Sequence, residues 1–215
     1  MSDGVTTQTT TKPSLIVVLA ADPIAYVPYS ESFESATFPS STDYYITSQG
    51  VNSFHWNRVT TAAYTGSASL KLDNQAQSSD IDEFITPAID LSSITGPTMT
   101  FRVAYKRRNS GDTLDQLRVL SSTNCGISWV PRYTKGYSTL PTVTSTSSTA
   151  FVPTIAQWRL EPITISSFAG QSQVRFKFEF TGNGAGNNVY IDDININGTL
   201  SIEEEVHNGF GLTVY

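Results

Sequence analysis

Alternation of apolar and polar residues is the feature of this sequence that most limits its fold. In residues 173–180 four apolar residues alternate with three charged ones, and residues 98–106 repeat the pattern less strictly. A period of two is expected of a β-strand that buries one face. No window of a dozen residues shows the apolar spacing of an amphipathic helix with good helix formers between. The chain is therefore predicted to be all-β.

Further strands are expected at residues 68–73, 83–86, 114–120, 157–165 and 188–196, which clusters of Gly, Pro, Asn, Asp and Ser separate. About ten short strands in one chain indicate a β-sandwich or a barrel. We interpret residues 1–22 as the last strand of a preceding domain plus a linker, 23–198 as the sandwich, and 199–215 as an acidic linker. The Ser/Thr-rich residues 138–149 are expected to form a long exposed loop.

Composition excludes several functions. With 13 Lys and Arg against 19 Asp and Glu, the chain is mildly acidic, and its one dense basic patch lies at residues 106–108, so nucleic-acid binding is not expected. The longest apolar stretch, residues 15–21, is too short to cross a bilayer, so no membrane insertion is expected.

The single cysteine, Cys125, cannot form a disulfide within the chain, so the fold must be stabilised by its hydrophobic core. Only 15% of the residues are charged, against about 25% in an average soluble domain, which favours a secreted or cell-surface protein.

Motifs for catalysis are missing from the sequence. The two histidines, His55 and His207, lie far apart, and no zinc-peptidase motif or nucleophile with a neighbouring base is present. The candidate acids for a glycosidase are Asp80, Asp82, Glu83, Asp112 and Asp115. All of them stand where a loop meets a strand, a place where solvated acids are ordinary. We therefore expect no enzyme activity from this chain.

Two adjacent acids interrupt the apolar segment 189–196. Simple alternation places Asp192 on the core side of its strand, unless a bulge intervenes. A buried carboxylate needs a cation or several hydrogen-bond donors, and calcium is a natural partner of oxygen ligands. First and last strands commonly lie side by side in jelly-roll sandwiches, which would bring Glu34 close to Asp192. Glu34, Asp192 and Asp193 are thus a candidate calcium site; the alternative is that these acids are exposed at an edge or bonded to the backbone without metal.

Aromatic residues are the candidates for contact with a ligand. Trp56, Trp129 and Tyr133 are the residues proposed here, because aromatic rings stack on sugar rings. Core packing is the commoner fate of a strand tryptophan, and it is the alternative for Trp56, Trp129 and Trp158 alike.

Three motifs carry a resemblance to a known family. Residues 32–35 (SFES), 84–92 (FITPAIDLS) and 190–194 (YIDDI) resemble the MAM-like and cleaved-adhesin (gingipain adhesin-like) domains of secreted Bacteroidota proteins, and residues 121–129 and 174–178 fit the same pattern. The resemblance implies a jelly-roll β-sandwich of two antiparallel sheets with a structural calcium ion at Glu34 and Asp192. The chain departs from the cleaved adhesins at residues 41–44, where an Asp-Gly-Asp-rich loop would follow the first strand.

The flanking segments resemble known neighbours of such domains. Residues 9–18 are similar to the closing strand of a PKD-type domain, and residues 202–215 look like the linker into a type IX secretion sorting domain. That order resembles the C-terminal half of pappalysin-type zinc metallopeptidases. It implies an extracellular accessory or adhesion module, continuous with upstream PKD-like and catalytic domains, that binds a glycan or an extracellular protein. The alternative is a purely structural spacer of such a metallopeptidase.

Overall fold

The chain folds almost entirely into strands. The computed structural model describes residues 19, 24–39, 44–49, 55–74, 81–111, 113–182 and 186–200. The strands are β1 (Ile24–Tyr26), β2 (Tyr29–Glu31), β3 (Tyr45–Ser48), β4 (Asn57–Val59), β5 (Ser69–Leu72), β6 (Ile81–Ile85), β7 (Ala88–Asp90), β8 (Ile94–Tyr105), β9 (Gln116–Ser122), β10 (Val130–Gly136), β11 (Arg159–Thr164), β12 (Arg175–Thr181) and β13 (Val189–Leu200). Two single-turn 3-10 helices, η1 (Ile155–Gln157) and η2 (Ser166–Phe168), are the helices among the described residues. Neither is long enough to cross a membrane.

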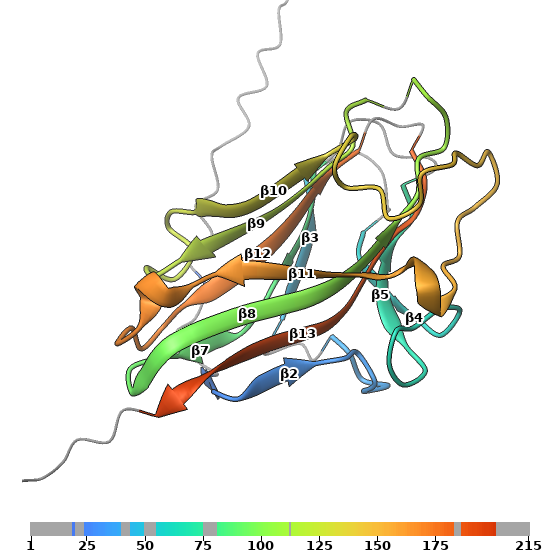
Figure 1. Cartoon of the computed structure of the whole chain (residues 1–215). Helices are drawn as coiled ribbons and strands as arrows, with labels where there is room; N and C mark the ends of the chain where they lie inside the picture. Colours follow the sequence, from blue (N-terminus) through green and yellow to red (C-terminus); the bar gives the residue numbers. More distant parts are fainter. Residues whose placement is uncertain are drawn as a thin grey trace, which may run out of the picture.

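The strands form two layers (Figure 1). One sheet has the order β10-β9-β12-β6-β3, and the other has the order β11-β8-β13-β5-β4, with β2 also paired to β13. Both sheets are antiparallel, which confirms the predicted jelly-roll sandwich. Each of the seven predicted strand ranges overlaps a strand of the structure. A small parallel pair, β1 with β7, was not expected.

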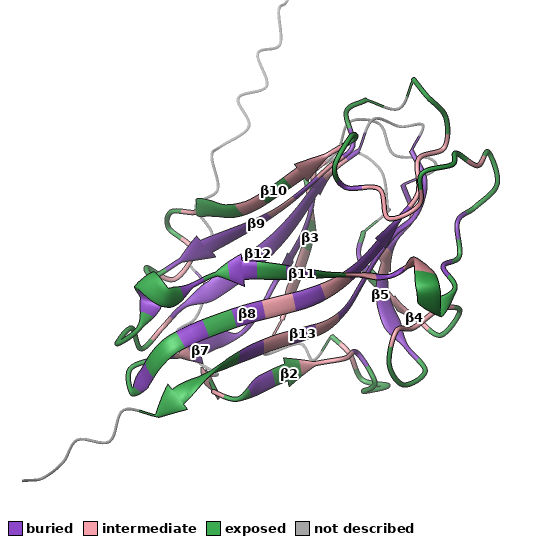
Figure 2. Ribbon diagram, viewed as in Figure 1, coloured by how far each residue is buried: buried purple, intermediate pink, exposed green. Residues whose placement is uncertain are grey.

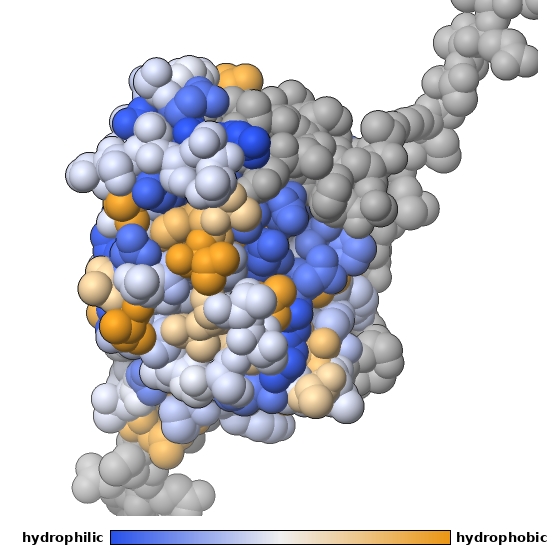
Figure 3. All heavy atoms as spheres, turned by 90° about the vertical axis from the view of Figure 1, so that its right-hand side faces the viewer, coloured by the Kyte–Doolittle hydropathy of each residue, from blue (hydrophilic) through white to orange (hydrophobic). Residues whose placement is uncertain are grey.

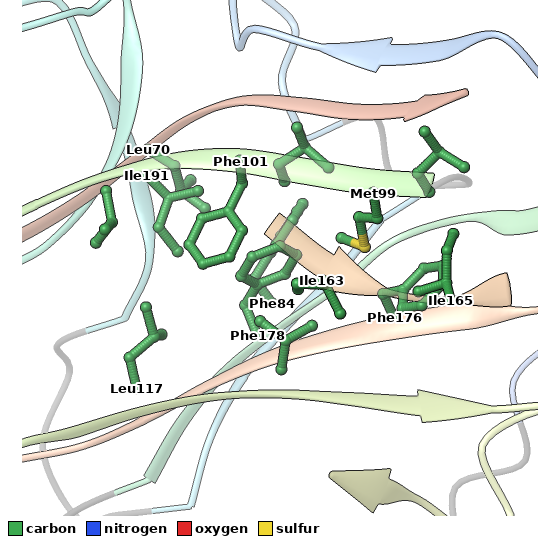
Figure 4. Packing of buried hydrophobic residues seen from close by; sticks show 14 of the residues in the cluster. Leu70, Phe84, Met99, Phe101, Leu117, Ile163, Ile165, Phe176, Phe178 and Ile191 are labelled. Carbon is green, nitrogen blue, oxygen red and sulfur yellow. The ribbon is translucent and has the colours of Figure 1, made fainter. Parts of the chain in front are cut away.

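The hydrophobic core fills the space between the sheets (Figure 4). Phe101 of β8 faces Phe178 of β12, with ring centroids 5.2 Å apart, and Phe84 of β6 lies 5.9 Å from Phe178. All three rings are fully buried. Full burial of such a side chain contributes about 1.5–3 kcal/mol, so the alternating apolar residues stabilise the packing of the two sheets.

The charged residues of β12 are not solvated, contrary to the prediction from alternation. Arg175, Lys177 and Glu179 are 1%, 8% and 4% exposed, and Figure 2 shows β12 and β9 buried along most of their length. These strands lie inside the sheet, so neighbours on both sides cover their outward side chains. Lys177 is paired with Glu83 of β6 at 2.5 Å.

A bulge in β13 changes which residues reach the core. The register against β8 shifts between Asp192 and Asn195, and Asp193 has a φ of 46°. Beyond the bulge, Ile194 and Ile196 belong to the core, whereas Tyr190 packs in a separate cluster. Simple alternation was therefore wrong at this point. Asp192 is buried, and it pairs with Arg102, whose guanidinium lies over the Tyr64 ring outside the main core, so Asp192 faces the outer side of the sheet.

The proposed domain boundaries fall mostly outside the described residues. Of residues 1–22 the structure describes only Leu19, and of residues 199–215 only 199 and 200, where β13 continues two residues past the expected end at 198. The segment 138–149 contains no strand, in agreement with a loop, although Leu140 within it is fully buried.

Candidate functional site

The three predicted acids surround one loop. Strand β2 pairs with β13, with Ser30 opposite Asn195, so the expected adjacency of the first and last strands of the domain is confirmed. This pairing places Glu34, just after β2, and Asp192, in β13, against residues 60–68, which connect β4 to β5. We call residues 60–68 together with these acids the carboxylate loop.

Glu34 binds one end of the carboxylate loop. Its Oε1 accepts a hydrogen bond from the amide of Ala68 at 2.8 Å, and its two oxygens accept bonds from the amide of Ser67 at 3.0 and 3.1 Å. These amide bonds hold the pKa of Glu34 below its ordinary value. Gly66 has a φ of 61°, and a Cβ there would lie 2.5 Å from the carboxylate, so this approach requires glycine.

Asp192 binds the other part of the loop. Its Oδ2 accepts hydrogen bonds from the amides of Tyr64 at 2.7 Å and Thr65 at 3.4 Å, and its Oδ1 accepts one from Asp193 at 2.8 Å. The residue is fully buried. Burial raises the pKa of Asp192 to about 7, which outweighs the lowering by the amides of Tyr64 and Asp193. The amides therefore compensate the buried charge only in part.

Asp193 completes the set from the more exposed side. Its Oδ1 accepts a hydrogen bond from the Thr65 hydroxyl at 2.5 Å. Carboxylate and hydroxyl oxygens are ligands that calcium prefers, so the chemistry of the donors fits the ion. Among the described residues, however, no three acidic, histidine or cysteine side chains meet closely enough to hold a metal. A calcium ion here would need additional oxygens, such as main-chain carbonyls.

A groove of about 500 Å³ lies on the outer face of the β10-β9-β12-β6-β3 sheet. Its floor is made by Tyr45, Thr47 and Gln49 along β3, Glu83 and Ile85 of β6, and Lys177 of β12. Tyr45 pairs with Ile85, which pairs with Lys177, and Thr47 pairs with Glu83. The groove therefore runs along the strands, one row of residues after another.

Charges on the floor of the groove neutralise one another. Lys177 Nζ lies 2.5 Å from Glu83 Oε1 and 3.5 Å from a Glu179 oxygen. Glu83 Oε2 also accepts a hydrogen bond from the Thr47 hydroxyl at 3.0 Å. Glu179 is bonded in turn to Arg118 of β9. The floor is thus polar but carries little net charge.

Trp129 forms a wall of the groove. It is half-buried, and its ring centroid lies 4.9 Å from Lys177 Nζ, a distance typical of a cation–π contact. Gly126 and Ile127, from the same connection between β9 and β10, line the groove beside it, together with Leu19. Of the three aromatic residues proposed from sequence, Trp129 is the one that lines this groove.

The other two aromatic candidates belong to the interior. Trp56 is fully buried, and its Nε1 donates a hydrogen bond to the Asp82 carbonyl at 3.2 Å, so it is unable to stack on a ligand. Tyr133 is half-buried, and its ring packs edge-on against Phe101 at 5.3 Å. Burial raises the pKa of Tyr133 well above its ordinary value. Neither ring lines the groove, because both pack against other parts of the sandwich.

The acids considered for a glycosidase are not solvated either. Asp82, Glu83 and Asp115 are 1%, 8% and 0% exposed. Asp115 accepts hydrogen bonds from the Tyr105 hydroxyl and from Asn74 Nδ2, and Glu83 is paired with Lys177. Asp115 and Glu83 are thus engaged by neighbouring side chains, and Asp82 is buried. Asp80 and Asp112 lie outside the described residues.

A third surface feature is apolar. Val152, which precedes η1, is 51% exposed, and Ile155, the first residue of η1, is 60% exposed. Figure 3 shows the side of the molecule that carries η1, with apolar atoms gathered near its centre and polar atoms around them. Val152 and Ile155 offer no hydrogen-bonding side chain, whereas the groove and the carboxylate loop both hold polar ones, so these two are the candidate sites.

Comparison with solved structures identifies the fold. The K1 cleaved adhesin domain of Lys-gingipain from Porphyromonas gingivalis W83 covers 80% of this chain with 98% of its own length, at a TM-score of 0.52 and 17% identity. The K2 domain of the same protein covers 80% with 99%, at 0.54 and 15%, and the K3 domain covers 79% with 98%, at 0.54 and 14%. This chain has the cleaved-adhesin fold. No protein-family model and no curated protein matches its sequence. The cleaved-adhesin fold agrees with the resemblance given by the sequence motifs; at these identities the similarity concerns the fold alone.

Proposed function

We propose that the chain is a non-catalytic module that binds glycans in the groove on the outer face of the β10-β9-β12-β6-β3 sheet. The observation that carries the proposal is the groove itself, in which a half-buried tryptophan faces a polar floor. Its volume of about 500 Å³ lies within the about 300–1,000 Å³ of pockets that hold small ligands.

The lining of the groove matches the two surfaces of a sugar ring. A pyranose presents C–H groups on its faces, which pack on aromatic rings, and Trp129 and Tyr45 supply such rings. It presents hydroxyl groups around its edge, which both donate and accept hydrogen bonds. Glu83 is an acceptor, Lys177 is a donor, and Gln49 is both, so the floor serves either kind of hydroxyl contact.

The charge of the floor favours a neutral glycan. Lys177 is already paired with Glu83 and Glu179, and an anionic sugar would have to compete with these carboxylates for the ammonium group. A neutral hydroxyl adds a hydrogen bond without breaking the pair, and it does not leave a buried charge alone. We therefore expect neutral oligosaccharides to bind more tightly than sialylated or uronic-acid ones.

Calcium is proposed as the structural ion of this module. The support is the convergence of Glu34, Asp192 and Asp193 on the carboxylate loop and the incompletely compensated charge of the buried Asp192. When bound, the ion would supply positive charge to this carboxylate. The role is structural, because the loop lies on the other sheet from the groove.

The setting of the module belongs to the proposal as well. We place it at the cell surface or outside the cell, as an adhesion or accessory module of a larger secreted protein, with a glycan or a glycosylated protein as partner. The flanking sequence motifs and the low charge support this setting. The competing function is a spacer without a ligand, and the groove argues against it because a spacer has no need of one.

A glycan array tests the proposal. The wild-type chain, in calcium-containing buffer, is expected to bind a set of neutral oligosaccharides, and Trp129→Ala is expected to weaken that binding at least about tenfold, or about 1.4 kcal/mol. Tyr137→Ala is the matched control, because Tyr137 is an aromatic residue with 43% exposure that does not line the groove. A blank array, or equal losses for both variants, would sink the glycan proposal and favour the spacer.

A further inference from the structure

Leu19, from the segment before the sandwich, lies in the groove. It is only 4% exposed, and its amide donates a hydrogen bond to the Cys125 carbonyl at 2.9 Å. Its side chain lines the groove beside Gly126 and Ile127. A residue remote in sequence from every other part of the groove is therefore fixed there by both a backbone bond and an apolar contact.

The turn that receives Leu19 is shaped for it. Gly126 has a φ of 81°, and a Cβ on it would lie 3.1 Å from Leu19 Cδ1 and 3.3 Å from Trp129 Cζ2. Both distances are tighter than an ordinary carbon contact, so Leu19 and Trp129 approach this turn closely because the residue has no side chain. Leu19 thus packs beside the same aromatic residue on which the proposed function depends.

The pairing of the strands shows where along the groove Leu19 lies. The β9–β10 connection begins after Ser122, which pairs with Arg175, the first residue of β12. Lys177, with its partners Ile85 and Tyr45, is the next row along that face; Thr47 and Glu83 follow, and Gln49 is farther still. Leu19 and Gly126 therefore lie at the end of the groove where the connection between β9 and β10 is, and Gln49 lies toward the opposite end.

We propose that Leu19 closes the groove at this end, so that the site receives the terminal ring of a neutral glycan and not an internal stretch of a chain. The inference rests on the proposed function and adds its specificity. A sugar ring seated beside Trp129 would meet the leucine side chain where the next ring of an extended chain would have to pass. The leucine side chain offers that ring no hydrogen-bond partner, so further rings are expected to extend the ligand toward Gln49.

Fluorescence quenching tests the closure without any ligand. Trp129 is the one half-buried tryptophan, since Trp56 and Trp158 are 0% and 7% exposed, so it dominates quenching by acrylamide. Leu19→Ala is expected to raise the quenching constant about twofold, because the ring loses a covering side chain. Leu160→Ala is the control of equal chemistry, because Leu160 is 46% exposed and does not line the groove. No change with Leu19→Ala would overturn the inference.

Binding then tests the specificity. The probes are β-1,4-linked oligosaccharides of glucose, xylose and galactose, each free at both ends or carrying a bulky group on one end or the other. Blocking one particular end is expected to weaken binding to the wild type about tenfold, whereas blocking the opposite end has little effect. In Leu19→Ala the two blocked forms are expected to bind within about twofold of each other.

The outcomes separate the two proposals. If the wild type binds oligosaccharides and tolerates a block at either end, the groove is open and the inference is overturned while the glycan function stands. If quenching responds to Leu19→Ala but no oligosaccharide binds, the proposed function fails and the terminal-ring specificity falls with it. A circular dichroism melt of Leu19→Ala close to that of wild type excludes unfolding as the cause of a change.

Discussion

The outer faces of the two sheets differ in how they are covered. On the β8–β13 side, Phe151, Trp158 and Tyr190 pack into a second apolar cluster, with Trp158 and Tyr190 rings 6.1 Å apart. On the β6–β12 side, Lys177 and Glu83 form an ion pair on the floor of a groove. Both faces are largely buried, but the first is closed by aromatic rings from the chain itself and the second keeps polar groups beside an open space.

This difference indicates which residues stabilise the fold and which are available to bind a ligand. In the aromatic cluster, Phe151, Trp158 and Tyr190 are buried, and the Tyr190 hydroxyl donates a hydrogen bond to the Phe151 carbonyl at 2.8 Å. Paired charges at the base of a groove add less to stability than apolar packing does, because desolvation offsets their attraction. The groove residues are therefore the ones we assign to binding.

The largest expected effect contrasts two tryptophans. Trp158→Ala on the closed face is expected to cost about 3–5 kcal/mol of unfolding free energy and to lower the Tm by roughly 10 °C, because it empties a packed cluster. Trp129→Ala in the groove is expected to cost under about 1 kcal/mol. Thermal unfolding followed by circular dichroism measures both. Similar losses in the two variants would show that the faces do not differ in role.

Calcium removal is expected to have the next largest effect. An ion bound only by the folded state at a concentration of 100 Kd stabilises the fold by about 2.7 kcal/mol, so EDTA should lower the Tm by several degrees. Glu34→Gln is expected to remove this response, because the carboxylate loses its charge. Asp90→Asn, whose Oδ1 accepts a hydrogen bond from the Ser92 amide away from the loop, is the control. A Tm that ignores EDTA in the wild type contradicts the calcium proposal.

The last expected effect concerns pH without calcium. The pKa of Asp192 in the folded state is about 7, above the ordinary 3.8, so the folded chain binds this proton more tightly than the unfolded chain does. The associated stability is fully present below about pH 4 and is lost as the pH rises through 7. Glu34, whose pKa is lowered, acts in the opposite sense and only at acid pH.

Denaturant unfolding in EDTA, from pH 5 to pH 8, measures this slope. Asp192→Asn is expected to flatten it, because the amide does not titrate and retains one acceptor oxygen for the loop amides. Asp90→Asn is the control, because the Asp90 side chain accepts a hydrogen bond from the Ser92 amide away from the carboxylate loop. An equally steep slope in Asp192→Asn would assign the pH dependence to other groups.

Local patterns were enough to predict the strands and the fold. The alternation in residues 173–180 became β12, and its four apolar residues all lie in the core. The pair Asp192 and Asp193 could be noticed in the sequence, because two adjacent acids are unusual in an otherwise apolar strand. The donors of the carboxylate loop, the amides of Tyr64, Thr65, Ser67 and Ala68, carried no signal, since every residue but proline has such an amide.

The groove was beyond the reach of local patterns. Glu83 and Lys177 are 94 residues apart and meet only because β6 and β12 are neighbours in one sheet. The sequence did not distinguish Trp56 from Trp129 as a ligand contact. In the structure Trp56 is buried in the core, whereas Trp129 lines the groove. The position of Leu19 in the groove could not be predicted, because an apolar residue before a strand is ordinary.

The sequence by itself determined that this chain is an all-β sandwich with an acidic pair in its last strand, because both follow from the period of side chains along a strand. The tertiary structure alone decided which outward face is closed by rings and which holds a groove. It also decided that a bulge carries Asp192 away from the core. Those outcomes depend on strand neighbours and on loops that return from far along the chain, and a period of two contains no information about either.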